Sequence, residues 1–506
     1  MEIQGIVSGA GRRGDVSRAR RSPAWYGRRS IILAVATIIA LGGIAAIPAL
    51  RTLSAPAGCL TASPQPRPSA AQPPRLPPAP AEPRFPVAVS KDRRYLVDEV
   101  GNPFLIVGDS PWSLSTNLSV SDMDYYFADR RAKGFNTALV GLLVSAYIGG
   151  RADLSTYDGL YPFTSGTGTS SDLSTPNPAY WSRVDAMVKL AEKHGITLML
   201  VPAETGALLP LLKHSGISKD FSYGAFLGSR YKNYRNIIWI SGNDYWASNW
   251  GNDPYVTAIA RGIRSTDPDH IQTVELDVDT SSVDNPNWLP LISLSAAYTY
   301  TPTYDRMLKA YEDTHRAPVF MAEANYEFEN NTGGPATTDE TLRRQEYWTM
   351  TSGAAGQLYG NCYTWRLPSD WKSHLDTKAV DELGYMTSLF GSLRWYDLVP
   401  DRTHALLTAG YGACPAKGDV LESTCATAAG TNDGTLATVY TPSVTGLTID
   451  LTRLRGRVTA RWYDPTTGSF TPVAGSPFAN RGTRDFTPTG NNAEGKGDWV
   501  LVLQTE

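Results

Sequence analysis

The sequence has few cysteines, no excess of positive charge and no clustering of metal-binding residue types. Only 4 of the 506 residues are cysteine, and 46 Lys and Arg residues face 49 Asp and Glu residues. Without a basic face, nucleic acid is a disfavoured partner. The cysteines and the 6 histidines show no zinc or iron–sulfur spacing, so we expect no metal and no cofactor.

The four cysteines carry different expectations. Cys414 and Cys425 lie close together in a stretch rich in glycine, alanine and threonine, which predicts a local disulfide outside the cytosol. Cys362 lies in an apolar run and is expected to be a buried free thiol. Lipidation of Cys59 is disfavoured, because Pro56 stands where a lipobox has an aliphatic residue.

The N-terminal segment predicts export or anchoring. Arginines are concentrated in residues 1–30, and residues 31–50 form an uncharged apolar run. A helix of that length just spans a hydrocarbon core of ~30 Å, and the arginines place residues 1–30 in the cytoplasm. We favour an uncleaved single-pass anchor with the body on the extracellular side, and the alternative is a cleaved signal and a secreted protein. Residues 51–87 are rich in proline and predict an extended linker.

From about residue 103, short apolar runs alternate with helical patterns. The helical segment 119–134 has Ser121 as its expected N-cap, and another helix has Thr337 as N-cap with Glu340 three residues later. Residues 177–195 carry an apolar stripe at helical spacing. The expected strands are 104–110, 135–143, 196–202, 236–242, 271–276, 291–298, 318–324 and 357–365.

Eight strands that alternate with helices predict an α/β fold, a (β/α)8 TIM barrel over residues 88–401. The rival fold is an open doubly wound sheet, which usually has a glycine-rich phosphate loop after its first strand. Here the first strand ends in "GDSPW" without such a loop. After residue 401, short alternating runs with turn signals predict a β-sandwich over 402–506 that packs on the barrel or binds carbohydrate.

Acidic residues gather at the expected carboxyl ends of the strands, where a barrel collects its chemistry. Hydrolysis of a glycosidic bond needs one acid to protonate the leaving oxygen and a second carboxylate at the anomeric carbon. The fourth and seventh strands face each other across a barrel mouth, so we assign Asp244 as general acid/base and Glu323 as nucleophile, which corresponds to retention. The further acids at this rim are Asp109, Glu204 and Glu275.

The competing explanation for each acid is structural. A lone carboxylate at a strand end is more often a helix cap or half of an ion pair. The paired acids, with Trp112, Trp246 and Trp365 on neighbouring loops, favour a function in sugar binding and cleavage. The arginines of the later helices are expected to be solvated helix charges: Arg316, Arg343 and Arg344.

Several stretches resemble, in order, the apiosidase-like glycoside hydrolases of glycoside hydrolase family 140. They are "FLIVGDSPWSL", "PNPAYW", "YGAFLGSRYKNYRNIIWISGND", "PVFMAEANYE", "RRQEYWTMTSGAAGQLYGNCYTW" and "LVPD", over roughly 88–401. The resemblance implies a (β/α)8 barrel, a small C-terminal β domain labelled collagen-binding, and removal of apiose from pectic side chains. By motif, the catalytic pair falls on Asp244 and Glu323. The substrate contacts fall on Asp109, Trp112, Tyr326 and Glu327.

The chain departs from the family pattern at three places. Asn243 stands where the family has the second glycine of Gly-Gly-Asp, and its side chain is a candidate sugar contact or a wall that narrows the pocket. Phe328 replaces a small residue, and Glu204 adds an acid at the rim. These changes leave a glycosidase as the first hypothesis and the sugar open. The alternative is a non-catalytic cell-surface protein that binds carbohydrate or acts in adhesion; no metal or nucleophile motif supports a protease.

Overall fold

The structure of this chain is a computed structural model that describes residue 59 and residues 83–331 and 335–505. The segments expected to be cytoplasmic and membrane-spanning, and most of the linker, lie outside these described residues. Within them, no helix is both long enough and apolar enough to cross a membrane.

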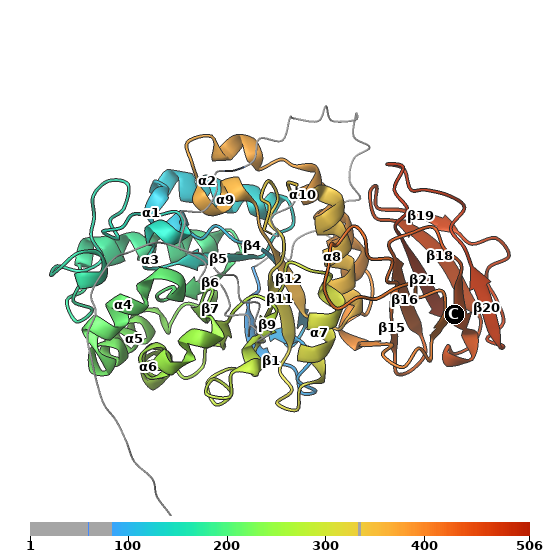
Figure 1. The fold of residues 1–506 in the computed structure, drawn as a ribbon, viewed down its shortest axis with the longest axis horizontal. Coiled ribbons are helices and arrows are strands. Elements are labelled where there is room, and N and C mark those ends of the chain that lie inside the picture. The colour runs from blue at the N-terminus through green and yellow to red at the C-terminus, as the bar shows by residue number, and fades with distance from the viewer. Residues whose placement is uncertain (1–58, 60–82, 332–334, 506) are drawn as a thin grey trace, which may run out of the picture. The chain divides into compact units, whose positions relative to one another are not determined.

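A nearly closed barrel forms the larger part of the chain (Figure 1). Its nine-stranded sheet has the order β8-β7-β6-β5-β4-β12-β11-β10-β9, and β9 (Thr280–Ser281) is antiparallel to β10. A backbone hydrogen bond of 3.0 Å from Ser293 to Gln272 joins the segment before β10 to β8. The eight parallel strands confirm the predicted barrel: β4 (Ile106–Asp109), β5 (Thr137–Gly141), β6 (Thr197–Val201), β7 (Ile237–Gly242), β8 (Gln272–Glu275), β10 (Ser295–Tyr298), β11 (Val319–Glu323) and β12 (Gly356–Tyr359).

Helices surround the strands, and two of their N-caps differ from the expectation. Ser119, not Ser121, caps α2 by accepting from Asp122 N at 3.1 Å, and Thr338, not Thr337, caps α8. A capping side chain must reach the N–H groups of the first turn, and a pattern locates that turn only to within two residues. The helices are α1 (Leu114–Asn117), α2 (Val120–Ala132), α3 (Pro178–Lys193), α4 (Thr205–Ser215), α5 (Ile217–Tyr231), α6 (Asp253–Thr266), α7 (Thr303–Glu312), α8 (Asp339–Thr351), α9 (Cys362–Arg366) and α10 (Lys378–Gly391).

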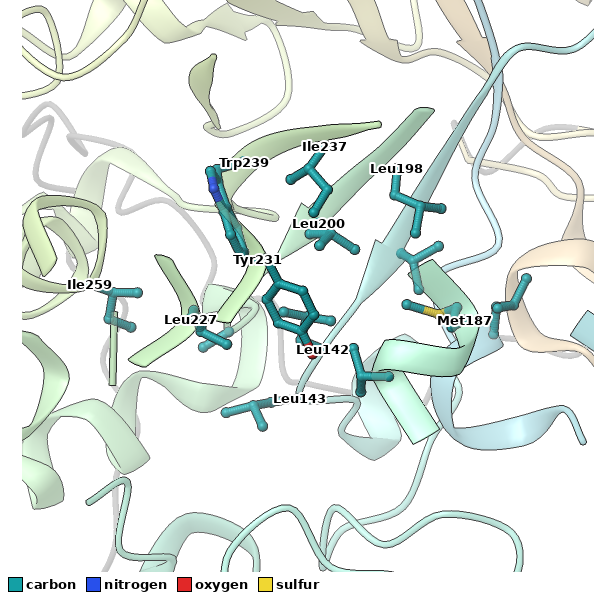
Figure 2. Packing of buried hydrophobic residues seen from close by; sticks show 14 of the residues in the cluster. Leu142, Leu143, Met187, Leu198, Leu200, Leu227, Tyr231, Ile237, Trp239 and Ile259 are labelled. Carbon is teal, nitrogen blue, oxygen red and sulfur yellow. The ribbon is translucent and has the colours of Figure 1, made fainter. Parts of the chain in front are cut away.

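An apolar layer holds the helices to the outer face of the barrel. Figure 2 shows Met187 of α3 and Leu227 of α5 beside side chains of β6 and β7, among them Leu198 and Trp239. All five stripe residues predicted on α3 are buried, as expected of one helical face turned to a sheet: Trp181, Val184, Met187, Val188 and Ala191.

The last predicted strand is too long, and one cysteine prediction is wrong. The strand expected over 357–365 ends at Tyr359, and Asn361 caps the short helix α9 by accepting from Tyr363 N at 2.8 Å. Cys362 is not a free thiol, because it forms a disulfide with Cys59. Its partner lies 303 residues away in the proline-rich linker, where no local pattern indicates a pairing. The expected disulfide between Cys414 and Cys425 is present.

The C-terminal part is all β, as predicted, and Figure 1 draws it in orange to red. It has a six-stranded sheet of order β13-β15-β16-β21-β18-β19 and a three-stranded sheet of order β14-β17-β20. The first strand, β13, belongs to this sheet although it precedes the expected boundary. The strands are β13 (Leu398–Pro400), β14 (Leu407–Ala409), β15 (Thr427–Thr431), β16 (Leu436–Thr441), β17 (Leu447–Asp450), β18 (Val458–Asp464), β19 (Ser469–Pro472), β20 (Thr483–Phe486) and β21 (Trp499–Thr505). A small sheet of β1 (Pro86–Val89), β2 (Leu96–Asp98) and β3 (Pro103–Phe104) precedes the barrel.

Helix α8 joins the barrel to the C-terminal sheet. Tyr347 stacks on Tyr440 of β16 with a ring distance of 5.2 Å, inside an apolar cluster shared by both parts. Arg343 is fully buried and donates to Asp498 at 2.8 and 3.0 Å and to Glu382 at 2.7 Å. The prediction of solvated helix charges is therefore wrong for this arginine and for the buried Arg344. Arg316 is exposed, as expected, but it lies in the loop after α7 and not on a helix. A helix face that looks polar in sequence carries an ion-pair network once a second domain covers it.

Candidate active site

A strained turn presents Asp244 at the end of β7. Gly242, Asn243 and Asp244 have φ values of 94°, 87° and 46°, all in the left-handed region that favours glycine. A Cβ atom on Gly242 would lie 1.9 Å from the carbonyl oxygen of Glu275. The two non-glycine residues, Asn243 and Asp244, cost free energy in this conformation, and backbone strain of this kind is concentrated at functional sites. The φ of Asn243 also explains why a glycine suits this position.

Two tyrosine hydroxyls bind the Asp244 carboxylate. Tyr147, in the short helix η1 (Ala146–Ile148) after β5, donates to Oδ2 at 2.6 Å. Tyr298, the last residue of β10, donates to Oδ1 at 3.0 Å. Tyr147 comes from the loop after β5 and Tyr298 from the end of β10, so the barrel rather than the local chain positions this acid.

Glu323 closes β11 and is buried with two phenols of its own. Tyr300 donates to Oε1 and Tyr326 donates to Oε2 at 3.2 Å. The indole of Trp112 donates to the Tyr326 hydroxyl at 3.0 Å. Burial, together with the negative charge of Asp244, raises the pKa of Glu323 to about 8. Glu323 therefore holds a proton at neutral pH when Asp244 is ionised.

Tyr298 and Tyr300 connect the two acids. Their hydroxyl oxygens lie 2.7 Å apart, one bound to Asp244 and the other to Glu323. The two tyrosines are separated by Thr299, so their side chains leave the extended chain on the same face. The structure thus brings the two predicted catalytic residues into one hydrogen-bonded set.

Glu275 is a third carboxyl group close enough to this pair to interact with the charges of both acids. It ends β8, pairs in register with Gly242, and is fully buried. Asn243 Nδ2 lies 3.4 Å from its Oε1, and the carbonyl oxygen of Glu275 accepts from Asn243 N at 3.2 Å. Burial raises the pKa of Glu275 well above its usual value, and the charges of Glu323 and Asp244 add to that shift. Glu275 therefore contacts the strained turn through both its side chain and its backbone.

Glu204 acts as a helix cap. It accepts from Ala207 N at 2.7 Å at the start of α4, and Ser145 donates to its other oxygen at 2.6 Å. Burial raises the pKa of Glu204 to about 7. This arrangement matches the structural explanation given above for a lone acid at the rim.

Asp109 lies at the end of β4 and is fully buried. Tyr126 donates to it at 2.5 Å, Arg130 at 3.3 Å and Thr364 at 3.2 Å. Burial raises the pKa of Asp109 although Arg130 opposes the shift. Its neighbours on α2 and α9 give it a structural role, and a contact with substrate stays a prediction.

The other predicted sugar contacts have different neighbours and differ in burial. Trp112 and Tyr326 adjoin Glu323, whereas Asn243 faces Glu275. Trp365 lies on α9, where its indole donates to Glu329 at 2.5 Å. The remaining two are Trp246, half-buried before η3 (Ala247–Asn252), and Glu327, which accepts from Tyr359 and Asn361 and whose pKa burial raises to about 7.

Sequence reasoning missed three tyrosines of the site. Tyr298 and Tyr300 could have been found, because the run "AYTYT" sets two tyrosines two residues apart where a predicted strand ends. Tyr147 had no such signal, since it lies six residues beyond β5 in a loop whose path the sequence does not specify.

The model of the family "Apiosidase-like, catalytic domain" matches residues 90–397. The chain belongs to the apiosidase-like family. It is therefore a glycoside hydrolase. A second family model, "Putative collagen-binding domain of a collagenase", matches residues 418–504 of this apiosidase-like protein. No curated protein sequence matches the chain.

Solved structures agree with this family at the level of the fold. A structure described as a glycoside hydrolase superposes with a TM-score of 0.71 at 21% identity, covering 84% of this chain and 97% of its own. A glycoside hydrolase family 5 protein from Bacteroides vulgatus also gives 0.71, at 22% identity, covering 84% of this chain and 93% of its own. A structure from that organism described as a "putative glycoside hydrolase" gives a TM-score of 0.59 at 12% identity, covering 83% of this chain and 82% of its own.

Proposed function

We propose that Asp244 and Glu323 hydrolyse an O-glycosidic bond of a plant or cell-wall polysaccharide with retention of configuration, outside the cell. The observation that carries the proposal is the hydrogen-bonded set at the barrel mouth. It holds two acids, from the ends of the fourth and seventh barrel strands, within reach of the adjacent hydroxyls of Tyr298 and Tyr300.

The proposed roles follow from what each acid must do. Asp244, half-buried at the tip of its turn, protonates the leaving oxygen and later activates water. Glu323 attacks the anomeric carbon as a carboxylate and is held in place by Tyr300 and Tyr326. The pair must then carry one proton in total, on Asp244, when the sugar is bound.

Two observations support the finer parts of the proposal. The disulfides Cys59–Cys362 and Cys414–Cys425 suit an oxidising compartment and hence a site outside the cytosol. The match to an apiosidase-like catalytic domain supports apiose as the first sugar to test, and it favours an enzyme over a non-catalytic binding protein.

The test is digestion of aryl glycosides, an aryl apioside among them, and of pectic polysaccharides, with identification of the released sugar. We expect Asp244→Asn and Glu323→Gln each to lower the rate by about 10²–10⁴-fold. Glu346→Gln is the matched control: this buried acid of α8, whose pKa burial raises to about 8, lies outside the set, and its loss should leave the rate unchanged.

Proton NMR of the first-formed product gives the stereochemistry. Retention is expected if Glu323 is the nucleophile, and an inverted product would overturn the retaining part alone. If the wild-type protein releases no sugar, or if both variants keep the full rate, the assignment of this pair is wrong.

A further inference from the structure

Four oxygen atoms form a continuous chain between the two acids. Asp244 Oδ1 lies 3.0 Å from the Tyr298 hydroxyl, which lies 2.7 Å from the Tyr300 hydroxyl, and the Tyr300 hydroxyl is hydrogen-bonded to Glu323 Oε1. Each of these contacts is within hydrogen-bond distance for two oxygen atoms. The chain therefore has three gaps, and each gap needs one proton.

The two phenols supply only two of the three protons. A hydroxyl group donates one hydrogen and accepts with its lone pairs. If both tyrosines donate to carboxylates, the 2.7 Å contact between their oxygens has no hydrogen and becomes repulsive. A third proton, carried by one of the two carboxyl groups, gives each of the three contacts one hydrogen. The hydrogen bonds then all point from the protonated carboxyl group toward the ionised one, whichever of the two acids holds the proton.

From this count we propose that Tyr298 and Tyr300 form a proton relay that passes one proton between Glu323 and Asp244. The inference rests on the proposed function, in which this pair cleaves the glycosidic bond. It goes further by giving both tyrosines a direct part in preparing the catalytic protonation state.

The transfer is balanced at each atom. When Glu323 holds the proton, it donates to Tyr300, Tyr300 donates to Tyr298, and Tyr298 donates to ionised Asp244. The shift moves the Glu323 proton to the Tyr300 oxygen, the Tyr300 proton to the Tyr298 oxygen, and the Tyr298 proton to Asp244. Both tyrosines end neutral, Glu323 is an ionised nucleophile, and Asp244 is a protonated acid, as the proposed mechanism requires.

The backbone fixes the relay in place. Thr299 N donates to the carbonyl oxygen of Glu323 at 3.1 Å, and the side-chain amide of Asn325 donates to the carbonyl oxygen of Tyr300 at 2.8 Å. The two tyrosine rings meet edge to face at 86° with centroids 5.2 Å apart. The hydroxyls therefore keep their contact without a rearrangement of the chain.

Burial explains why the proton starts on Glu323. That residue has the raised pKa described above, and direct contact with water is largely excluded there. The charged and titratable groups that face the pair come from the neighbouring strand ends: Tyr147, Glu204, Glu275, Tyr326 and Glu329.

The test compares Tyr298→Phe, Tyr300→Phe and the double variant on the substrate found in the digestion experiment. Each single change should lower the rate by about 10–100-fold and narrow the bell-shaped pH profile by about one pH unit, because the pair then holds its single proton over a smaller pH range. The double variant should lose no more than the worse single variant, since one break already interrupts the relay. Losses that multiply, or an unchanged pH profile, would overturn the proposal.

Tyr147→Phe provides the matched control. Tyr147 also donates to Asp244 but is not one of the hydroxyl groups that connect Asp244 to Glu323. Its loss should move one limb of the pH profile, and combined with Tyr300→Phe its effect should multiply. Only two members of the relay are expected to show losses that do not multiply. If the losses of Tyr147→Phe and Tyr300→Phe also fail to multiply, the relay assignment is wrong.

An infrared titration separates failure of the relay from failure of the proposed function. The band of the protonated carboxyl group, assigned with Glu323→Gln, should titrate near pH 8 in the wild-type protein. Tyr298→Phe and Tyr300→Phe should shift this titration by similar amounts, and the double variant by no more. Shifts that add would reject the relay, even if the protein hydrolyses nothing.

Discussion

Buried acids occur in two regions of this protein, and their neighbours differ. At the barrel mouth, Glu323 is contacted by phenols and influenced by other acids, and burial raises its pKa to about 8. Between α8 and the C-terminal sheet, burial also acts on Glu340, but a hydrogen bond from Lys496 and the charge of Arg344 outweigh it and lower its pKa. The cations near Glu340 therefore favour its charged form, whereas Glu323, which lies among phenols and acids, remains able to exchange a proton.

The α8 region also contains three acids that resemble a cation site, Asp339, Glu382 and Glu494. The ammonium group of Lys378 lies among them, 2.5 Å from Asp339 and in contact with Glu494. The lysine already supplies the positive charge there, which fits the structural character of this region.

The largest expected effect comes from removing the central arginine of the ion-pair network between α8 and the C-terminal sheet. Arg343→Met leaves Asp498 and Glu382 buried without their partner and should lower the free energy of unfolding by about 3–5 kcal/mol. Urea unfolding measures this loss. The rate per folded molecule should stay at the wild-type value, and a selective loss of rate would contradict the separation of the two regions.

The next largest effect is a difference between the two regions in how the free energy of unfolding depends on pH. The pKa of Glu323 in the folded protein lies above the ordinary value of 4.5. The contribution of Glu323 to the free energy of unfolding is therefore fully present below pH 4.5 and is lost as the pH rises toward 8. Glu323→Gln removes this loss and should gain roughly 3 kcal/mol over the wild-type protein at pH 7. Urea unfolding across this pH range would show it.

Glu340→Gln should change the free energy of unfolding at pH 7 in the opposite direction to Glu323→Gln. The folded pKa of Glu340 is lowered, so its stabilisation is present above its ordinary pKa and disappears as the pH falls through the folded pKa. The variant should be less stable than the wild-type protein at pH 7. The same sign in both variants would contradict the comparison.

A third change tests the support of the catalytic turn. Glu275→Ala removes the side chain that meets Asn243, and a displacement of Asp244 by about 1 Å should cost up to 10²-fold in rate. Steady-state kinetics measures the loss, with circular dichroism as the check on folding. Glu275→Gln can keep the contact, so it should recover most of the rate.

The smallest effect concerns strain. Asn243→Gly relieves a φ of 87° but loses the contact with Glu275 and loosens the unfolded chain, so the free energy of unfolding should change by less than about 1 kcal/mol. Asn243→Ala gains nothing in φ and should be the less stable of the two. Thermal unfolding of both variants tests this ranking.

The fold could be read from the sequence to a large extent. The alternation of strands and helices predicted the barrel, and the acids at the ends of the fourth and seventh strands were found because parallel strands bring their carboxyl ends to one rim. The capping residues were displaced by one or two positions. Cys362 and Arg343 were misread because each depends on a partner at least 150 residues away in the chain.

The sequence by itself determined the order of the elements and placed Asp244 and Glu323 at strand ends, since hydrophobic periodicity and strand direction are local properties. The tertiary structure decided which acids stay protonated and which are neutralised, because burial and the charges of residues from other strands set each pKa. It also decided that Tyr298 and Tyr300 lie between the two acids, which only closure of the barrel brings about.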